Sequence, residues 1–268
     1  MDLLGVDIDT QIDAVKKMLR ILSEADESES PPYLSYQLHK ILWEIQGYSD
    51  PYLAAKKNSN QIALGFLDNL RALTKEGDDQ LELGMKIGAA GNIVDVIHAR
   101  DYHLWDEVEN AVCQDLFGGG LESFRSMISE STHLLYLADN AGETVFDRVF
   151  IETLDIPVIY VVKGGAILND ATLEDALAVG IDTVAEIFET GSNAPGTILE
   201  LCSEGFRKIF EGAPLVLAKG QANFETIENQ GEKVFHLLRM KCPLLSKVIG
   251  APHGSLVLKQ ADHFNQTL

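Results

Sequence analysis

Four short apolar runs in the second half of the chain constrain its fold more than any other feature. The runs cover Leu134–Ala138, Pro157–Val162, Ile181–Val184 and Ala213–Ala218, of which the third is the weakest. Most of their residues are apolar at successive positions, whereas a strand with one face in water would alternate apolar and polar residues. Strands of this kind are typical of a parallel sheet that helices cover on both faces.

Amphipathic stretches separate these runs. Residues 145–154, 173–179 and 196–210 have the spacing of helices, and residues 234–238 and 255–258 could add two further strands. The alternation of strands and helices predicts a doubly wound α/β domain with a mostly parallel sheet. In open sheets of this type, ligands bind at the carboxyl ends of the strands.

The first half of the chain reads instead as a succession of helices. Apolar residues recur at helical spacing in the segment Ile12–Leu22, and Thr10 followed by Asp13 predicts a capped start for this helix. We therefore expect an N-terminal helical subdomain at residues 1–130 and an α/β core at residues 131–268 that carries the active site. The stretch Asp7–Thr10 briefly resembles a phosphatase nucleophile motif, but its context favours a helix N-cap.

The charge balance and the cysteines exclude several classes of protein. With 21 Lys and Arg against 41 Asp and Glu, the formal net charge is −20, which disfavours binding to nucleic acid and to anionic membranes. No apolar stretch approaches the roughly 20 residues needed to span a bilayer, and no signal peptide is evident, so we expect a cytoplasmic protein. Cys113, Cys202 and Cys242 form no CxxC pair, which argues against a thiolate zinc site and a disulfide framework.

Polar residues and glycines follow each predicted strand. The first strand runs into Asp139–Glu143, the second into Lys163–Asp170, and the fourth into Lys219–Glu225, while Thr190–Thr197 follows the third. Because the carboxyl ends of parallel strands meet at one edge of a sheet, we expect these segments to share one active site.

Within this shared site, Asp139 and Asp170 are hard oxygen donors that could converge on one cation, and Asn140 would add a neutral carbonyl oxygen. Ligation by oxygen alone suits Mg²⁺ or Mn²⁺, and the shortage of nearby histidine argues against zinc. Taken singly, Asp139–Asn140 after a strand is also compatible with a helix cap or an Asx turn.

Basic residues and backbone amides of the same segments could hold a phosphate group. Lys163 and Lys219 both lie at strand ends, where an ammonium could bind a phosphate, although each could also be a solvated loop residue. The backbone N–H groups of Gly164 and Gly165, and those of the predicted helix start at Gly196–Thr197, could add anion contacts.

The helical half supplies one further candidate, where the segment Gly91–Asp95 interrupts a helical region. A simple helix junction explains this interruption equally well. The functional interpretation is that Asn92 and Asp95 reach over the edge of the sheet and help to close a substrate pocket. The chain has no GxxxxGK[ST] loop, no complete GxGxxG after a strand and no GxSxG elbow, which disfavours the best-known nucleotide-binding and hydrolase signatures.

Three motifs together resemble the DUF89 family, whose members include the damage-control phosphatases. They are Asp-Asn-Ala-Gly-Glu at 139–143, Lys-Gly-Gly-Ala-Ile-Leu-Asn-Asp-Ala-Thr at 163–172 and Lys-Gly-Gln-Ala-Asn-Phe-Glu at 219–225. The segments 91–95 and 50–52 also match stretches of its small, stand-alone archaeal and bacterial members. The resemblance extends from about residue 50 to the end of the chain.

The resemblance implies a helical subdomain packed on a Rossmann-like core and a single divalent metal ion, often Mn²⁺, Co²⁺, Ni²⁺ or Mg²⁺. By this resemblance Asp139, Asn140 and Asp170 match the metal ligands of the family, and Glu143 and Lys219 match pocket residues near the phosphate. One departure is the missing N-terminal CxxC pair that stand-alone prokaryotic members often carry. This departure concerns any thiol-linked property and leaves the metal site untouched.

The leading hypothesis is therefore metal-dependent phosphatase activity on a small phosphorylated metabolite of the sugar-phosphate or cofactor-phosphate type. Asp170 or Glu143 would orient or deprotonate the attacking water, or Asp139 would attack directly, and the sequence does not separate these routes. An S-adenosylmethionine-dependent carboxyl methyltransferase and a non-catalytic protein that binds a phosphorylated ligand are the alternatives. The sequence does not specify the substrate, the physiological metal or the oligomeric state.

Overall fold

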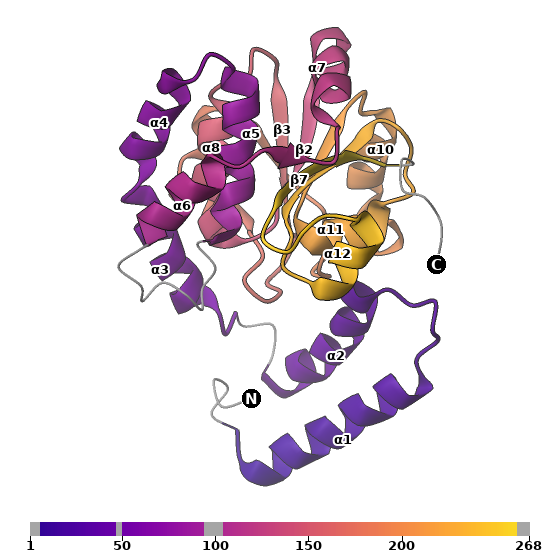
Figure 1. Cartoon of the computed structure of the whole chain (residues 1–268). Coiled ribbons are helices and arrows are strands. Elements are labelled where there is room, and N and C mark those ends of the chain that lie inside the picture. Colours follow the sequence, from indigo (N-terminus) through magenta and orange to yellow (C-terminus); the bar gives the residue numbers. More distant parts are fainter. Residues whose placement is uncertain (1–5, 47–49, 94–103, 262–268) are drawn as a thin grey trace.

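The computed structural model describes residues 6–46, 50–93 and 104–261, and its centre is a mostly parallel β-sheet with helices on both faces (Figure 1). Within these residues the sheet has seven strands in the order β1-β7-β6-β5-β2-β3-β4. Neighbouring strands are parallel except for β6 and β7, which are antiparallel. The strands are β1 (Leu116–Phe117), β2 (Leu134–Leu137), β3 (Val158–Val162), β4 (Glu186–Glu189), β5 (Val216–Lys219), β6 (Val234–Arg239) and β7 (Leu256–Gln260).

Helices α1 to α7 come from the first half of the chain. They are α1 (Ile8–Glu24), α2 (Pro31–Gln46), α3 (Leu53–Leu64), α4 (Leu67–Glu76), α5 (Gln80–Ala90), α6 (Leu104–Val112) and α7 (Leu121–Glu130). Those of the second half are α8 (Thr144–Ile151), α9 (Leu173–Ala178), α10 (Glu204–Gly212), α11 (Gly220–Ile227) and α12 (Pro243–Ile249). The predicted doubly wound α/β fold, preceded by a largely helical N-terminal half, is therefore confirmed.

The side chains of β2 show why this strand is apolar at every position. Leu134 and Tyr136 pack into the larger core cluster, together with residues of α5 and α8. Leu135 and Leu137 point the other way and pack with Phe206 and other residues beneath α10 and α11. Because successive side chains of a strand point to opposite faces, a strand between two helical layers needs apolar residues at every position.

Two predicted elements are displaced in the structure. Ile181–Thr183 forms a 3₁₀ turn instead of the third strand, and the strand β4 follows it at Glu186–Glu189. This strand lies at the edge of the sheet, where both of its terminal glutamates are exposed, so it has no continuous apolar run. The helix predicted at 196–210 begins only at Glu204, because Ser203 is its N-cap and accepts a hydrogen bond from the backbone of Phe206.

Helix α1 begins earlier than Thr10, so the predicted start at Thr10 is wrong and the N-cap interpretation of Asp7–Thr10 is right. Asp7 is the N-cap, and its Oδ1 accepts a hydrogen bond from the backbone N–H of Thr10 at 3.0 Å. Helix α1 packs on α2, which in turn contacts α11, so that the two helices form a hairpin beside the core (Figure 1). Among the described residues, no helix is long and apolar enough to cross a membrane.

Candidate active site

The segments that follow β2 and β3 are joined directly by their backbones. Asn140 and Asp170 form an isolated antiparallel bridge. The N–H of Ala141 donates to the carbonyl of Asn169 at 2.9 Å, and that of Ala171 donates to the carbonyl of Asp139 at 2.8 Å. These bonds hold the Asp-Asn and Asn-Asp motifs side by side at the carboxyl edge of the sheet, as the sequence predicts.

Asp139 lies partly buried at this edge, and its carboxylate has three neighbours that fix its position. Its Oδ2 accepts hydrogen bonds from Nδ2 of Asn140 at 3.1 Å and from Nδ2 of Asn92 at 3.4 Å. Gly220, which follows β5, has a φ of +79°, and a Cβ atom at this position would overlap Oδ2 and Cγ of Asp139. Only glycine combines this left-handed backbone with the close approach of a carboxylate.

Glu143 and Lys219 form a buried ion pair next to Asp139. Lys219 Nζ donates to Glu143 Oε2 at 3.0 Å and to Asp147 Oδ1 at 2.7 Å. Glu143 Oε1 also accepts from Nδ2 of Asn140 at 2.7 Å and from Nδ2 of Asn92. The two carboxylates raise the pKa of Lys219 despite its burial, so the ammonium stays charged. Lys219 thus lies in the predicted site, but two protein carboxylates already engage it.

Asp147, which the sequence analysis missed, completes this network. Its two carboxylate oxygens accept hydrogen bonds from the hydroxyls of Tyr136 at 2.6 Å and Tyr160 at 2.7 Å. Burial raises the pKa of Asp147, and Lys219 opposes this effect. The signal in the sequence was an acidic residue on the apolar face of α8, next to Phe146, Val149 and Phe150. A carboxylate in such surroundings requires a buried cation or several donors.

Lys163 and Asp170 form a second buried pair at the end of β3. Lys163 Nζ lies 3.5 Å from Asp170 Oδ2 and donates to the carbonyl of Gly196. Beyond this ion pair, Asp170 Oδ2 has no hydrogen-bond partner although it is fully buried. Burial raises the pKa of Asp170 to about 6, and Lys163 limits the increase. A buried carboxylate oxygen without a donor is the atom that a metal ion would satisfy.

The donor set at this edge fits a divalent ion bound by oxygen. Among the described residues no group of three or more His, Cys, Asp or Glu could hold a metal ion. The ligands predicted from the sequence, Asp139, Asp170 and Asn140, comprise two carboxylates and an amide and stay a prediction. Burial first, and then the charges of Glu143 and Asp170, raise the pKa of Asp139 well above its ordinary value, while Lys219 and Lys163 oppose the shift. A bound cation would favour the ionised form of this carboxylate. Asn140 presents its amide nitrogen to the carboxylates, so ligation through Oδ1 requires the amide to turn over.

The glycines after β3 serve loop packing. A Cβ atom on Gly164 would lie 2.5 Å from Cα of Gly191, so the loops after β3 and β4 are in backbone contact. The N–H of Gly164 already donates to the carbonyl of Ser192 at 2.8 Å. The N–H of Thr197 likewise donates to Thr226 Oγ1 at 2.9 Å, and no helix begins there. Both amides thus have partners in the protein, and the anion contacts at Gly164 and Thr197 stay predictions that would require these hydrogen bonds to break.

Gly165 lies in a cavity of about 300 Å³ that borders the site. Its lining comprises Asp50, Leu53, Lys163, Gly164, Gly165, Ala166, Thr172, Leu173, Glu174 and Glu189. Most of these side chains are small or polar, and none is aromatic. The cavity therefore joins the loop after β3 to the beginning of α3.

The helical half contributes Asn92 and, less expectedly, Lys56. Asn92 is buried in the 3₁₀ turn Gly91–Ile93 and reaches both Asp139 and Glu143, whereas Asp95 lies outside the described residues. Lys56 is buried on α3 and forms ion pairs with Asp175 at 2.7 Å and with Asp50 at 3.2 Å. Asp175 also accepts from Thr172 in the capping box of α9, so Lys56 anchors the segment that follows Asp170.

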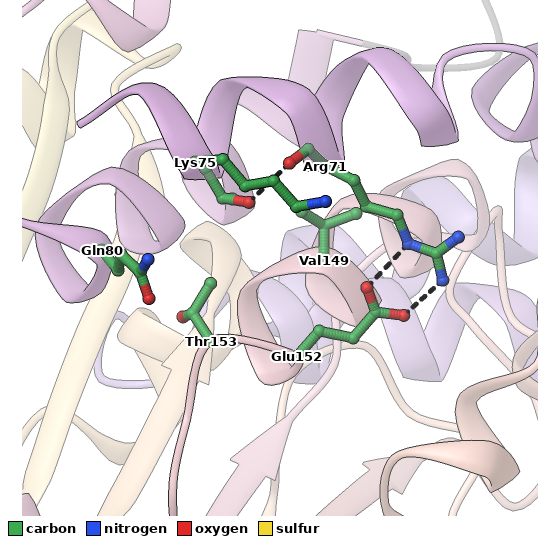
Figure 2. Close-up of a pocket in the computed structure, with 7 residues that line it drawn as sticks. Arg71, Lys75, Gln80, Val149, Glu152 and Thr153 are labelled. Carbon is green, nitrogen blue, oxygen red and sulfur yellow. Dashed lines mark hydrogen bonds and ion pairs between the residues drawn. The ribbon is translucent and has the colours of Figure 1, made fainter.

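A separate cavity of about 410 Å³ lies at the other end of α8 and contains none of the predicted site residues (Figure 2). Arg71 forms two hydrogen bonds to Glu152 on one of its walls, at 2.8 and 2.6 Å. Glu152 also pairs with Arg148 at 3.1 Å. Figure 2 shows Arg71, from α4, facing Glu152, which directly follows α8. The carboxylates that could bind a metal lie at the opposite end of α8.

The chain is similar to one protein-family profile, to several archaeal proteins and to a solved structure. Residues 5–257 match the sequence profile of the damage-control phosphatase ARMT1-like domain. An uncharacterised protein of Methanocaldococcus jannaschii is 35% identical over 92% of this chain and 86% of its own length. Damage-control phosphatases of Pyrococcus horikoshii and Archaeoglobus fulgidus are each 30% identical, over 88% and 92% of this chain and 84% and 89% of their own lengths. The crystal structure of a DUF89 family protein from P. horikoshii superposes with a TM-score of 0.86 at 27% identity, covering 97% of this chain and 93% of the other.

Proposed function

Because this chain belongs to the damage-control phosphatase ARMT1-like family, also called DUF89, we propose that it is a metal-dependent phosphatase that hydrolyses phosphomonoesters of small metabolites. The observation that carries the proposal is the convergence of Asp139, Asn140 and Asp170 through the backbone bridge between their two segments. The buried Oδ2 of Asp170 has only the Lys163 ammonium, 3.5 Å away, as a partner and makes no hydrogen bond, which supports a metal ion at this point.

A divalent ion held by Asp139, Asn140 and Asp170 would neutralise the charge of a phosphoryl oxygen and lower the pKa of a bound water. The side chains of the protein would position the substrate and compensate charge. Asp139 is the least buried of the three site carboxylates, so it is the one that faces an incoming phosphate. Asn92 and Gly220 hold it in place. Positioning of this kind contributes to catalysis because the reacting groups need no rearrangement.

Lys219 and Lys163 contribute positive charge from within the protein. Lys219 compensates Glu143 and Asp147, and Lys163 compensates Asp170, so the site does not carry the full charge of its carboxylates. A chain with a net charge of −20 needs such local compensation to admit an anionic substrate. Asp170 or Glu143 would orient a water molecule or accept its proton once the substrate is bound, or Asp139 would attack directly.

The cavity beside Gly165 suits the organic part of a small hydroxylated substrate. Three carboxylates, those of Asp50, Glu174 and Glu189, line it and can accept hydrogen bonds from hydroxyl groups. Its lining offers no aromatic side chain on which a nucleobase could stack. These features favour a sugar phosphate, or a cofactor phosphate whose polar part enters the cavity.

Hydrolysis of p-nitrophenyl phosphate tests the proposal most directly. Metal-stripped protein is assayed alone and after separate addition of Mg²⁺, Mn²⁺, Co²⁺, Ni²⁺ or Zn²⁺, beside the variant Asp139→Ala. We expect at least one ion to restore turnover in the wild type and none to restore it in the variant. Equal turnover without metal, or full turnover of Asp139→Ala, contradicts the proposal. Inactivity with every ion, combined with binding of S-adenosylmethionine by calorimetry, would support a methyltransferase instead.

A further inference from the structure

Helix α1 has two apolar faces, and only one of them packs against the rest of the chain. Ala14 is buried, and Met18 and Ile21 are partly buried, at the spacing that faces α2. The adjacent face, roughly 100° around the helix axis, also carries large aliphatic side chains, and the charged residues of α1 lie on the side opposite α2. The aliphatic residues of this adjacent face are Ile8, Ile12, Val15, Leu19 and Leu22, each between 45% and 65% exposed.

These five residues, which we call the α1 seam, stand out within the part of the chain that the structure describes. That part has nine exposed large hydrophobic residues, and five of the nine belong to the α1 seam. Contiguous apolar strips of this kind are uncommon on monomeric soluble proteins and mark sites of association. The solvent-facing side of a helix would otherwise carry polar residues.

The spacing of the α1 seam is that of a helix–helix contact. Its members follow one another at intervals of four, three, four and three residues, which are the a and d positions of a heptad repeat. Side chains at these positions form a narrow stripe along the helix that interlocks with an equivalent stripe on a second helix. A second copy of α1 therefore matches the α1 seam in shape and in length.

The charges on α1 favour an antiparallel pairing of two copies. The N-cap Asp7 and then Asp9 and Asp13 lie at its beginning, and Lys16, Lys17 and Arg20 follow in its second half, which ends at Glu24. Antiparallel copies would place the acidic half of each helix beside the basic half of the other, whereas parallel copies would bring like charges together. The opposed helix dipoles act in the same direction as these charges.

The position of α1 leaves the α1 seam open to such a partner. The hairpin of α1 and α2 projects from the body of the molecule, with α2 between α1 and α11 (Figure 1). We propose that α1 is a homodimerisation element, in which two copies of the chain pack their α1 seams antiparallel about a two-fold axis. Together with the two α2 helices they form a four-helix bundle, which is the isologous arrangement usual in dimers.

The side chains also favour one register. If Ile12 packs against Val15 of the second copy, Ile8 packs against Leu19 of that copy, so each layer joins an a to a d position. In this register Asp9 lies beside Lys16 of the second copy. Opposite charges commonly pair in this way along the edges of a helix–helix contact. The register that instead joins Val15 to Leu19 would bring the two copies of Lys16 together.

Light scattering coupled to size-exclusion chromatography tests the dimer on the full chain. We expect the wild type to have twice the chain mass of 29.4 kDa. Leu19→Glu buries a charge in the α1 seam and should raise the dimer dissociation constant at least about 100-fold. The matched control Lys17→Gln changes the charge of the same helix by the same amount outside the α1 seam, and it should remain a dimer. A monomeric wild type, or a dimeric Leu19→Glu with an unchanged dissociation constant, overturns the proposal.

A charge exchange tests the orientation. Asp9→Lys should weaken the dimer because it places two lysines together, and the double variant Asp9→Lys/Lys16→Asp should restore it. Circular dichroism of each variant establishes that α1 is still folded. Failure of the double variant to recover the affinity of the wild type overturns the antiparallel register.

Discussion

Gly220 and Asp139 belong to the ends of adjacent strands, and they lie so close that no side chain fits between them. A Cβ atom at position 220 would overlap the carboxylate of Asp139 and lie 2.8 Å even from its farther oxygen, Oδ1. The glycine thus allows β5 and β2 to bring their functional ends together. It explains why a flexible residue stands directly after the buried Lys219.

Gly220→Ala should therefore inactivate the enzyme. The added methyl group displaces the carboxylate of Asp139, and a displacement of about 1 Å costs on the order of 10²-fold in rate. Gly231→Ala is the matched control, because Gly231 has a similar φ of +91° but a Cβ atom there would meet nothing within 4 Å. Backbone strain should cost each variant about 1–2 kcal/mol of stability, the overlap with Asp139 should add to the cost of Gly220→Ala, and only Gly220→Ala should lose turnover. Equal activity of the two variants in the phosphatase assay would exclude the steric argument.

Asp170→Asn should abolish metal-dependent turnover and leave the fold intact. The amide retains the shape of the side chain but removes the negative charge that would hold a cation, and we expect kcat/KM to fall by about 10²–10³-fold. Calorimetric titration with Mn²⁺ should show weaker binding, and circular dichroism should be unchanged. Asp182→Asn, at an exposed position, serves as the control. Retained turnover with unchanged Mn²⁺ affinity would remove Asp170 from the metal site.

Asp147→Asn should destabilise the protein more than the loss of either tyrosine hydroxyl that it binds. The substitution removes one of the two carboxylates that compensate the buried Lys219, and breaking a buried pair costs about 3–5 kcal/mol. Tyr160→Phe deletes a single hydrogen bond to the same carboxylate and should cost about 1–3 kcal/mol. Urea unfolding measures both free energies. A smaller cost for Asp147→Asn than for Tyr160→Phe would show that Glu143 alone suffices for Lys219.

His236 should make the stability of the protein depend on pH below neutrality. It is fully buried on β6, and burial lowers its pKa to about 3, compared with about 6.5 in an unfolded chain. The unfolded state therefore binds a proton that the folded state excludes. The free energy of unfolding is therefore not lowered by His236 above pH 6.5. It decreases as the pH falls from 6.5 toward 3, by at most about 1.4 kcal/mol per pH unit.

Comparison with His236→Phe isolates this effect, because phenylalanine keeps a ring beside Phe224 and does not titrate. The free energy of unfolding of each protein is measured in urea at pH 7, 6 and 5. The wild type should lose stability relative to the variant as the pH falls. A constant difference between the two proteins over this range would show that His236 titrates alike in the folded and unfolded states.

The sequence predicted the central strands because a strand that is buried on both faces is a continuous run of apolar residues. The apolar runs at 134–138, 157–162 and 213–218 became β2, β3 and β5, and the polar segments after them meet at one edge. The sequence analysis predicted the edge strand at 181–184 instead of at β4, because β4 has exposed glutamates at both ends and therefore no continuous apolar run. The division into units at residue 130, and a role for Asp95, stay predictions.

Local pattern in the sequence thus determined the class of fold, the family motifs and the proposed metal ligands Asp139, Asn140 and Asp170. Only the tertiary structure decided the partners of these residues. Asp147 reaches Lys219 across α8 and β5, and Lys56 reaches Asp175 from a helix far away in the sequence. The physical reason is that burial and strand ends follow local periodicity, whereas the pairing of buried charges depends on which segments the whole fold brings together.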